Sequence, residues 1–187
     1  MVSNPLHYFA SPPVVSRDLL CLWINLLMLR YRDYRPEIDA LLRRFAPLEM
    51  ELVQACADIP GSFWGAPEAG LIGSCLYLRE DTPVHSVLHE TGHFVCMDAG
   101  RRSRLHTNAG GDVAEEDAVC YLQVLMADQL AAIGRGRLFS DMDAWGYSFR
   151  LGSARAWFER DAEEAGEWLL RHGLIDALGK ITWRLRR

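Results

Sequence analysis

The chain has 187 residues, half of them apolar and 24% charged, and a formal net charge of -5. We therefore expect one domain over residues 1–187, with a core large enough to need no disulfide or structural metal. The acidic balance argues against a nucleic-acid partner, and nothing in the composition indicates an oligomeric state.

The cysteines and the N-terminal region predict a cytoplasmic protein. Five scattered cysteines include no Cys-x-x-Cys pair, which is typical of buried free thiols in a reducing compartment. No Lys or Arg precedes Arg17, and no cleavage site follows, so we expect no signal peptide. The apolar run of residues 19–29 is shorter than the roughly 20 residues that span a bilayer, which predicts a core helix and no membrane contact.

The N-terminal third is predicted to be helical. Ser16 can cap a helix over residues 17–31, and Pro36 can open a second helix that continues to about residue 57 with a break at Pro47. The short apolar run 71–78, between a glycine and a charged turn, predicts a strand.

Three further helices are predicted over residues 83–99, 112–133 and 153–172. A proline opens the first helix, while Asp112 and Ser153 are suitable N-cap residues for the other two. Glycines at positions 100, 134 and 173 supply the stops, and the tail from residue 174 is consistent with one more short helix. The elements together predict an α+β fold that is mostly helical, with a small sheet before the helix of residues 83–99.

The segment His89-Glu90-Thr91-Gly92-His93 lies in the middle of the helix predicted over residues 83–99. Residues four apart share one face of a helix, so His89 and His93 can bind a single ion, while Glu90 projects beside that face. In such a site zinc activates a water molecule, and the glutamate acts as the general base that allows this water to attack a peptide bond.

The surroundings of the motif support metal binding over coincidence. Apolar residues flank the segment on both sides, so its ionisable groups are expected to be buried, and buried ionisable groups need a partner. Gly92 is unfavourable inside a helix, which indicates that another backbone or a substrate approaches closely there.

A catalytic zinc site usually has a third protein ligand. Ala99 stands where a metzincin carries its third histidine, and His106 lies in a basic loop that favours a solvated histidine over a ligand. Glu115 and Glu116 on the next helix are the remaining candidates. The face of Glu115 continues through apolar residues, so Glu115 is preferred, although a capping box with Asp112 would also explain a glutamate there.

The motif helix, followed by a helix with Glu115-Glu116-Asp117-Ala118, resembles the gluzincin metallopeptidases, among them thermolysin and the repressor-cleaving regulatory peptidases of bacteria. The resemblance covers about residues 71–131. It implies a zincin-like metallopeptidase fold, one Zn²⁺ ion held by His89, His93 and Glu115, Glu90 as catalytic base, and a peptide or protein substrate.

Val119 departs from the gluzincin pattern, because relatives often carry there an Asp or Asn that orients a ligand histidine. A zinc-binding regulatory protein without activity is therefore the main alternative, and a helical protein with a coincidental motif is the second. In zincins the strand before the motif helix is commonly the edge to which a substrate pairs, and residues 71–78 fit that role or an ordinary buried strand. Candidates for a donor to the oxyanion are Tyr77, Tyr121, Tyr147 and His172.

Overall fold

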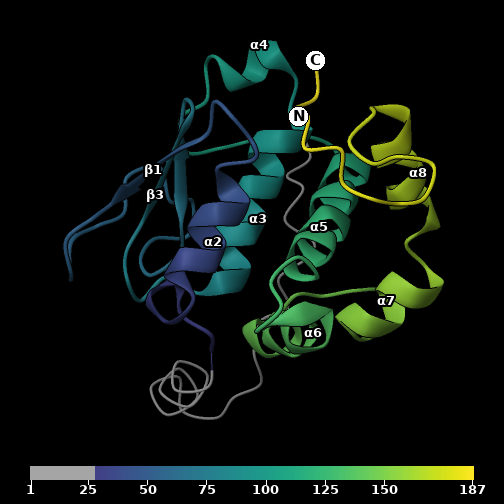
Figure 1. Cartoon of the computed structure of the whole chain (residues 1–187), viewed down its shortest axis with the longest axis horizontal. Coiled ribbons are helices and arrows are strands. Elements are labelled where there is room, and N and C mark those ends of the chain that lie inside the picture. The colour runs from purple at the N-terminus through teal and green to yellow at the C-terminus, as the bar shows by residue number, and fades with distance from the viewer. Residues whose placement is uncertain (1–27) are drawn as a thin grey trace, which may run out of the picture.

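The computed structural model describes residues 28–187 of the chain (Figure 1). The helix predicted over residues 17–31 falls almost entirely outside the described residues, and Tyr31 begins the 3₁₀ helix η1 (Tyr31–Asp33). None of the described helices combines the length and the apolar character that crossing a membrane requires.

The described residues form an α+β fold that is mostly helical, as predicted, with seven α-helices and one three-stranded sheet. The elements in chain order are α2 (Arg35–Leu42), β1 (Glu49–Leu52), β2 (Gly70–Ile72), β3 (Cys75–Leu78), α3 (Val84–Cys96), α4 (Ala99–Arg102), α5 (Val113–Ala127), α6 (Gly134–Trp145), α7 (Ala154–Arg160) and α8 (Glu163–Arg171).

The sheet has the order β1-β3-β2, with β1 parallel and β2 antiparallel to the central strand β3. The single strand predicted over residues 71–78 is in fact a hairpin, because Gly73 adopts a left-handed conformation with φ of 58° between β2 and β3. The second predicted helix is wrong beyond Leu42, because residues 49–52 form β1. Pairing with β3 overrides the helical preference of their Glu-Met-Glu-Leu sequence.

Several helix boundaries differ from the prediction. The motif helix α3 ends at Cys96, because Asp98 acts as a new N-cap and accepts the Arg101 backbone N–H at 2.9 Å to start α4. Helix α5 ends at Ala127, and α6, which the sequence analysis missed, begins at Gly134.

The helix predicted over residues 153–172 is divided into α7 and α8. The predicted cap is confirmed, since the Ser153 side chain accepts the Ala156 backbone N–H. The tail beyond α8 is not helical, and contains an isolated β-bridge between Ile175 and Ile181.

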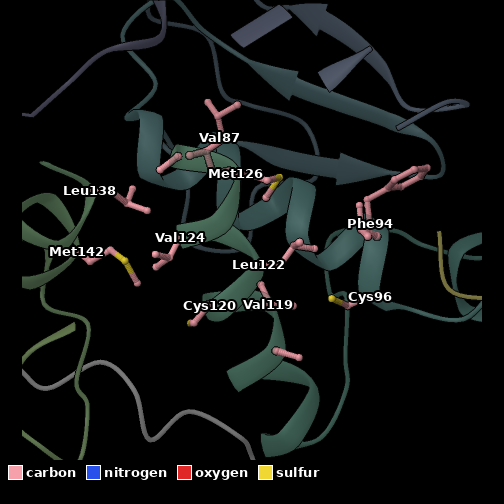
Figure 2. Packing of buried hydrophobic residues seen from close by; sticks show 14 of the residues in the cluster. Val87, Phe94, Cys96, Val119, Cys120, Leu122, Val124, Met126, Leu138 and Met142 are labelled. Atoms are coloured by element: carbon pink, nitrogen blue, oxygen red, sulfur yellow. The ribbon is translucent and has the colours of Figure 1, made fainter. Parts of the chain in front are cut away.

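Helix α3 is at the centre of the molecule, with the sheet on one side and α5 on the other (Figure 1). Helix α5 also packs against α6 and α8. Side chains from α3, α5 and α6 share one core, among them Val87, Leu122 and Leu138 (Figure 2). The predicted approach of another backbone at Gly92 is confirmed, because a Cβ there would lie 3.3 Å from the Val119 carbonyl oxygen and 2.9 Å from Val119 Cγ1. This contact holds the motif helix tightly against α5.

Candidate metal centre

Two histidines of α3 form the middle of the candidate site. The Nε2 atoms of His89 and His93, one helical turn apart, lie 3.2 Å from each other. The rings are nearly perpendicular, with an interplanar angle of 86°. Their side chains are 11% and 12% exposed, so both imidazoles are largely buried but keep some solvent contact. The helix brings the two imidazoles together as their spacing predicts.

A carboxylate from α5 lies against both histidines. Glu116 Oε1 is 3.3 Å from His89 Nε2, and Glu116 Oε2 is 3.6 Å from His93 Nε2. Burial alone would raise the pKa of Glu116, but the two imidazoles outweigh it and lower the pKa to about 2. Glu116 is therefore an anionic group held next to two nitrogen donors.

The neighbouring Glu115 is engaged elsewhere. Its carboxylate binds Arg101, with Nη1 at 3.0 Å, and Arg186, with Nη1 at 2.8 Å, and the residue is only 4% exposed. The structure brings Glu116, and not Glu115, to the histidines, which corrects the predicted choice between the two. The Glu115 side chain is buried, as the prediction required of a ligand, but it forms ion pairs with Arg101 and Arg186.

The apolar pattern of α5 could not distinguish the two glutamates because this helix is buried on nearly every side. Even the polar Gln123 on this helix is fully buried, and it donates through Nε2 to the His85 carbonyl oxygen at 2.8 Å. The predicted N-cap is confirmed, since Asp112 Oδ1 accepts the Glu115 N–H at 2.9 Å. The Glu115 carboxylate binds Arg101 and Arg186 instead of accepting the Asp112 backbone N–H, so the capping box is incomplete.

The side chains of His89, His93 and Glu116 converge closely enough to be compared with the ligands of a metal site. Donor atoms about 2.0 Å from a tetrahedral zinc ion are separated from one another by about 3.3 Å. The two Nε2 atoms are 3.2 Å apart, and Glu116 approaches them with different oxygens, Oε1 at 3.3 Å from His89 and Oε2 at 3.6 Å from His93. The two imidazoles and the carboxylate are therefore gathered at distances comparable with those between the ligands of one ion. Two imidazoles and one carboxylate are also a donor set of catalytic zinc sites.

Glu90 lies beside this donor set. Its carboxylate and the two imidazoles form a group whose ligand atoms are all within 4.8 Å of one another. Burial raises the pKa of Glu90 to about 8, and the nearby Glu68 and Glu116 carboxylates add to the effect against the pull of His89. None of the described residues donates a hydrogen bond to this carboxylate, which leaves it available to a bound molecule.

Of the four candidates for a donor to the oxyanion, Tyr147 lies at the site. It follows Gly146, whose left-handed conformation with φ of 104° ends α6, and its ring packs edge-on against His89 with centroids 5.7 Å apart. The other candidates pack elsewhere: Tyr121 stacks on Phe158, His172 lies on Trp168, and Tyr77 is on the sheet beside Cys75.

The loop histidine and the sheet edge have structural roles. His106 is exposed, as expected for a solvated histidine, and its backbone forms a bridge with Ile72. The N–H of Gly73 donates to Leu105, and that of Thr107 donates to Leu71. The loop therefore lies along the outer edge of β2, so this edge is paired within the chain, and pairing with a substrate was only one of the two roles predicted for residues 71–78.

Three groups near the centre were missed by the sequence analysis. Cys120 forms a group with His89 and Glu116 whose ligand atoms lie within 4.8 Å of one another. His85 is one helical turn before His89, so its helical spacing was a usable signal. Glu68 comes from the segment before β2, and no local pattern connects it with the motif.

Comparison of the chain with protein-family models, with curated proteins and with solved structures gives no match. The interpretation of the site therefore depends on its own geometry.

Proposed function

We propose that the protein is a zinc-dependent peptidase with His89, His93 and Glu116 as metal ligands and Glu90 as general base. The observation that carries the proposal is the convergence of two Nε2 atoms and one carboxylate at 3.2 to 3.6 Å. The gluzincin-like order of the motif helix and a following glutamate-bearing helix supports it, as does the small sheet beside α3.

The protein's own groups have distinct tasks in this proposal. A zinc ion held by the three ligands would supply Lewis acidity and a water of lowered pKa. Glu90 takes up a proton beside the scissile bond and returns one to the leaving amine. Tyr147, whose ring packs against His89, would donate its hydroxyl to the substrate carbonyl oxygen as negative charge develops there.

A zinc-binding regulatory protein without catalytic activity is the second candidate. Among the described residues no partner hydrogen-bonds to Nδ1 of His89 or of His93. Orienting partners of this kind normally hold ligand histidines in place, and the apolar Val119 supplies none. A peptide or protein is the bound partner in both interpretations.

The compartment belongs to the same proposal. Cys56, Cys75, Cys96 and Cys120 are free thiols, which suits a reducing environment such as the cytoplasm. Cys96 and Cys120 are buried as expected, whereas Cys56 is exposed.

Zinc content and peptide hydrolysis, measured together, test the proposal. We expect about one zinc per chain in the parent protein and in Glu90→Gln, with hydrolysis of a peptide library lost only in the variant. His93→Ala should lose both zinc and activity, while Glu80→Gln, at an exposed glutamate of the turn before α3, is the matched control. Zinc binding without hydrolysis of any peptide would favour the regulatory candidate, and the absence of zinc would contradict both.

A further inference from the structure

A cysteine beside the candidate metal centre has no role in the proposed peptidase. Cys120 follows Glu116 by four residues on α5, so the two side chains share one face of this helix. One ligand atom from each of His89, Glu116 and Cys120 lies within 4.8 Å of the other two. Cys120 is only 2% exposed. Its sulfur is therefore a further donor in a buried group of metal-binding side chains.

The packing of α5 on α3 explains why Cys120 meets His89. Glu116, in the first turn of α5, lies against His93 in the second half of α3. Gln123, two turns further along α5, donates through Nε2 to a carbonyl oxygen in the first turn of α3 at 2.8 Å. The two helices therefore run in opposite directions, and Cys120, halfway between these two contacts, is level with His89.

The donors of the centre form two matching pairs. His89 and His93 are one turn apart on α3, and Glu116 and Cys120 are one turn apart on the facing side of α5. Imidazole, carboxylate and thiolate are all ligands that zinc accepts. A catalytic site usually has three protein ligands and one position for water, whereas four protein ligands are typical of a closed site. A sulfur that binds the ion here would close the site.

Binding of the sulfur to an ion requires only the loss of a proton. Burial raises the pKa of the Cys120 thiol to about 11. A metal ion that coordinates a thiol displaces its proton to solvent outright, so ligation does not depend on a thiol that is already ionised. In the reverse step the bond between sulfur and metal breaks, the thiol takes up a proton, and a water molecule fills the position. No oxidant or other reactant is needed.

We propose that Cys120 is a fourth protein ligand of the metal centre, and that its sulfur occupies the position of the catalytic water in the resting protein. The inference rests on the proposed metal centre and adds a closed state to the peptidase, in which hydrolysis waits until water replaces the sulfur. Cys96 is the natural comparison, because it is also buried but belongs to no metal-binding group among the described residues. It comes from the end of α3, whereas Cys120 comes from α5 (Figure 2).

Absorption spectroscopy of the protein loaded with Co²⁺ detects a sulfur ligand directly. Cobalt binds the same donors as zinc, and a thiolate ligand gives it an intense charge-transfer band in the near ultraviolet that nitrogen and oxygen ligands lack. We expect about one cobalt per chain with this band in the parent and in Cys96→Ser, and bound cobalt without the band in Cys120→Ser and Cys120→Ala. Bound cobalt without the band in the parent would overturn the proposal and leave the three-ligand peptidase intact. A band that persists in both Cys120 variants would assign the sulfur to another cysteine and also overturn it.

Peptide hydrolysis in excess zinc tests whether the sulfur closes the site. If the open state is about a tenth of the parent protein or less, Cys120→Ala should hydrolyse a susceptible peptide about 10-fold faster or more, and Cys96→Ser should match the parent. Equal rates in the parent and in Cys120→Ala would overturn the closed state. If the cobalt band is present in the parent but neither protein hydrolyses any peptide, the sulfur ligand stands and the proposed catalytic function fails.

Discussion

Glu116 Oε1 lies 3.3 Å from Nε2 of His89, although its neighbour Glu115 was the better candidate on sequence grounds. The two adjacent glutamates of α5 leave the helix in different directions, so one approaches the histidines and the other an arginine cluster. They should therefore respond differently to the same substitution.

Replacement of Glu116 by Gln should weaken zinc binding. The substitution removes an anionic group from the donor set, so we expect a loss of affinity of about 10-fold or more, measured by competition with a chromophoric chelator. Glu115→Gln, the matched control, should bind zinc like the parent protein. The opposite result, with affinity lost only in Glu115→Gln, would contradict the ligand assignment.

Glu115→Gln should instead reduce the free energy of unfolding. Glu115 is 4% exposed and binds Arg101 and Arg186, so the neutral amide leaves two guanidinium groups without a counter-charge. We expect a loss of about 2 kcal/mol in urea unfolding, less than for a fully buried pair because both arginines retain some solvent contact. Unchanged stability would show that the cluster contributes little.

Removal of zinc should lower the melting temperature. A ligand that binds only the folded state stabilises it by about 4 kcal/mol at a free concentration a thousand times its dissociation constant. Melting the parent protein with excess zinc and with a chelator measures this difference. His93→Ala should melt at the same temperature under both conditions, and a zinc effect of equal size in that variant would point to binding elsewhere.

Gly92→Ala should separate α3 from α5. The added methyl group would lie 2.9 Å from Val119 Cγ1 and 3.3 Å from the Val119 carbonyl oxygen. We expect a net loss of about 1 kcal/mol or more in unfolding free energy despite the better helix propensity of alanine. Val119→Ala in the same chain should recover part of the loss. A double-mutant cycle without coupling would show that the contact at Gly92 is not limiting.

His85 should make the folded protein sensitive to acid. Burial lowers the pKa of His85 to about 3, whereas an unfolded histidine titrates near 6.5. Between these values the unfolded chain binds the extra proton, so the free energy of unfolding falls as the pH decreases, by about 2 kcal/mol from this group at pH 5.

The pH effect of His85 can be isolated with the His85→Phe variant. Both proteins are unfolded in urea at pH 7 and pH 5 with a chelator present, and the variant should lose less stability than the parent. The difference between the two proteins cancels the contributions of the other histidines. An identical pH dependence in both would contradict a neutral, buried His85.

The sequence alone was sufficient for the features that depend on local geometry. Residues four apart must share one helix face, so the pairing of His89 with His93 followed from their spacing once the helix was recognised. The N-caps at Asp112 and Ser153 were predictable because a cap bonds to the backbone only a few residues away.

Only the tertiary structure could decide which distant groups meet the histidines. Helix α5 is buried on nearly every side, so its apolar pattern had no single inward face from which to choose Glu116 over Glu115. Glu68 and Tyr147 reach the site from the segment before β2 and the end of α6, through contacts with residues far away in the chain. Such contacts depend on how helices and sheet pack together, a relationship that no local periodicity encodes.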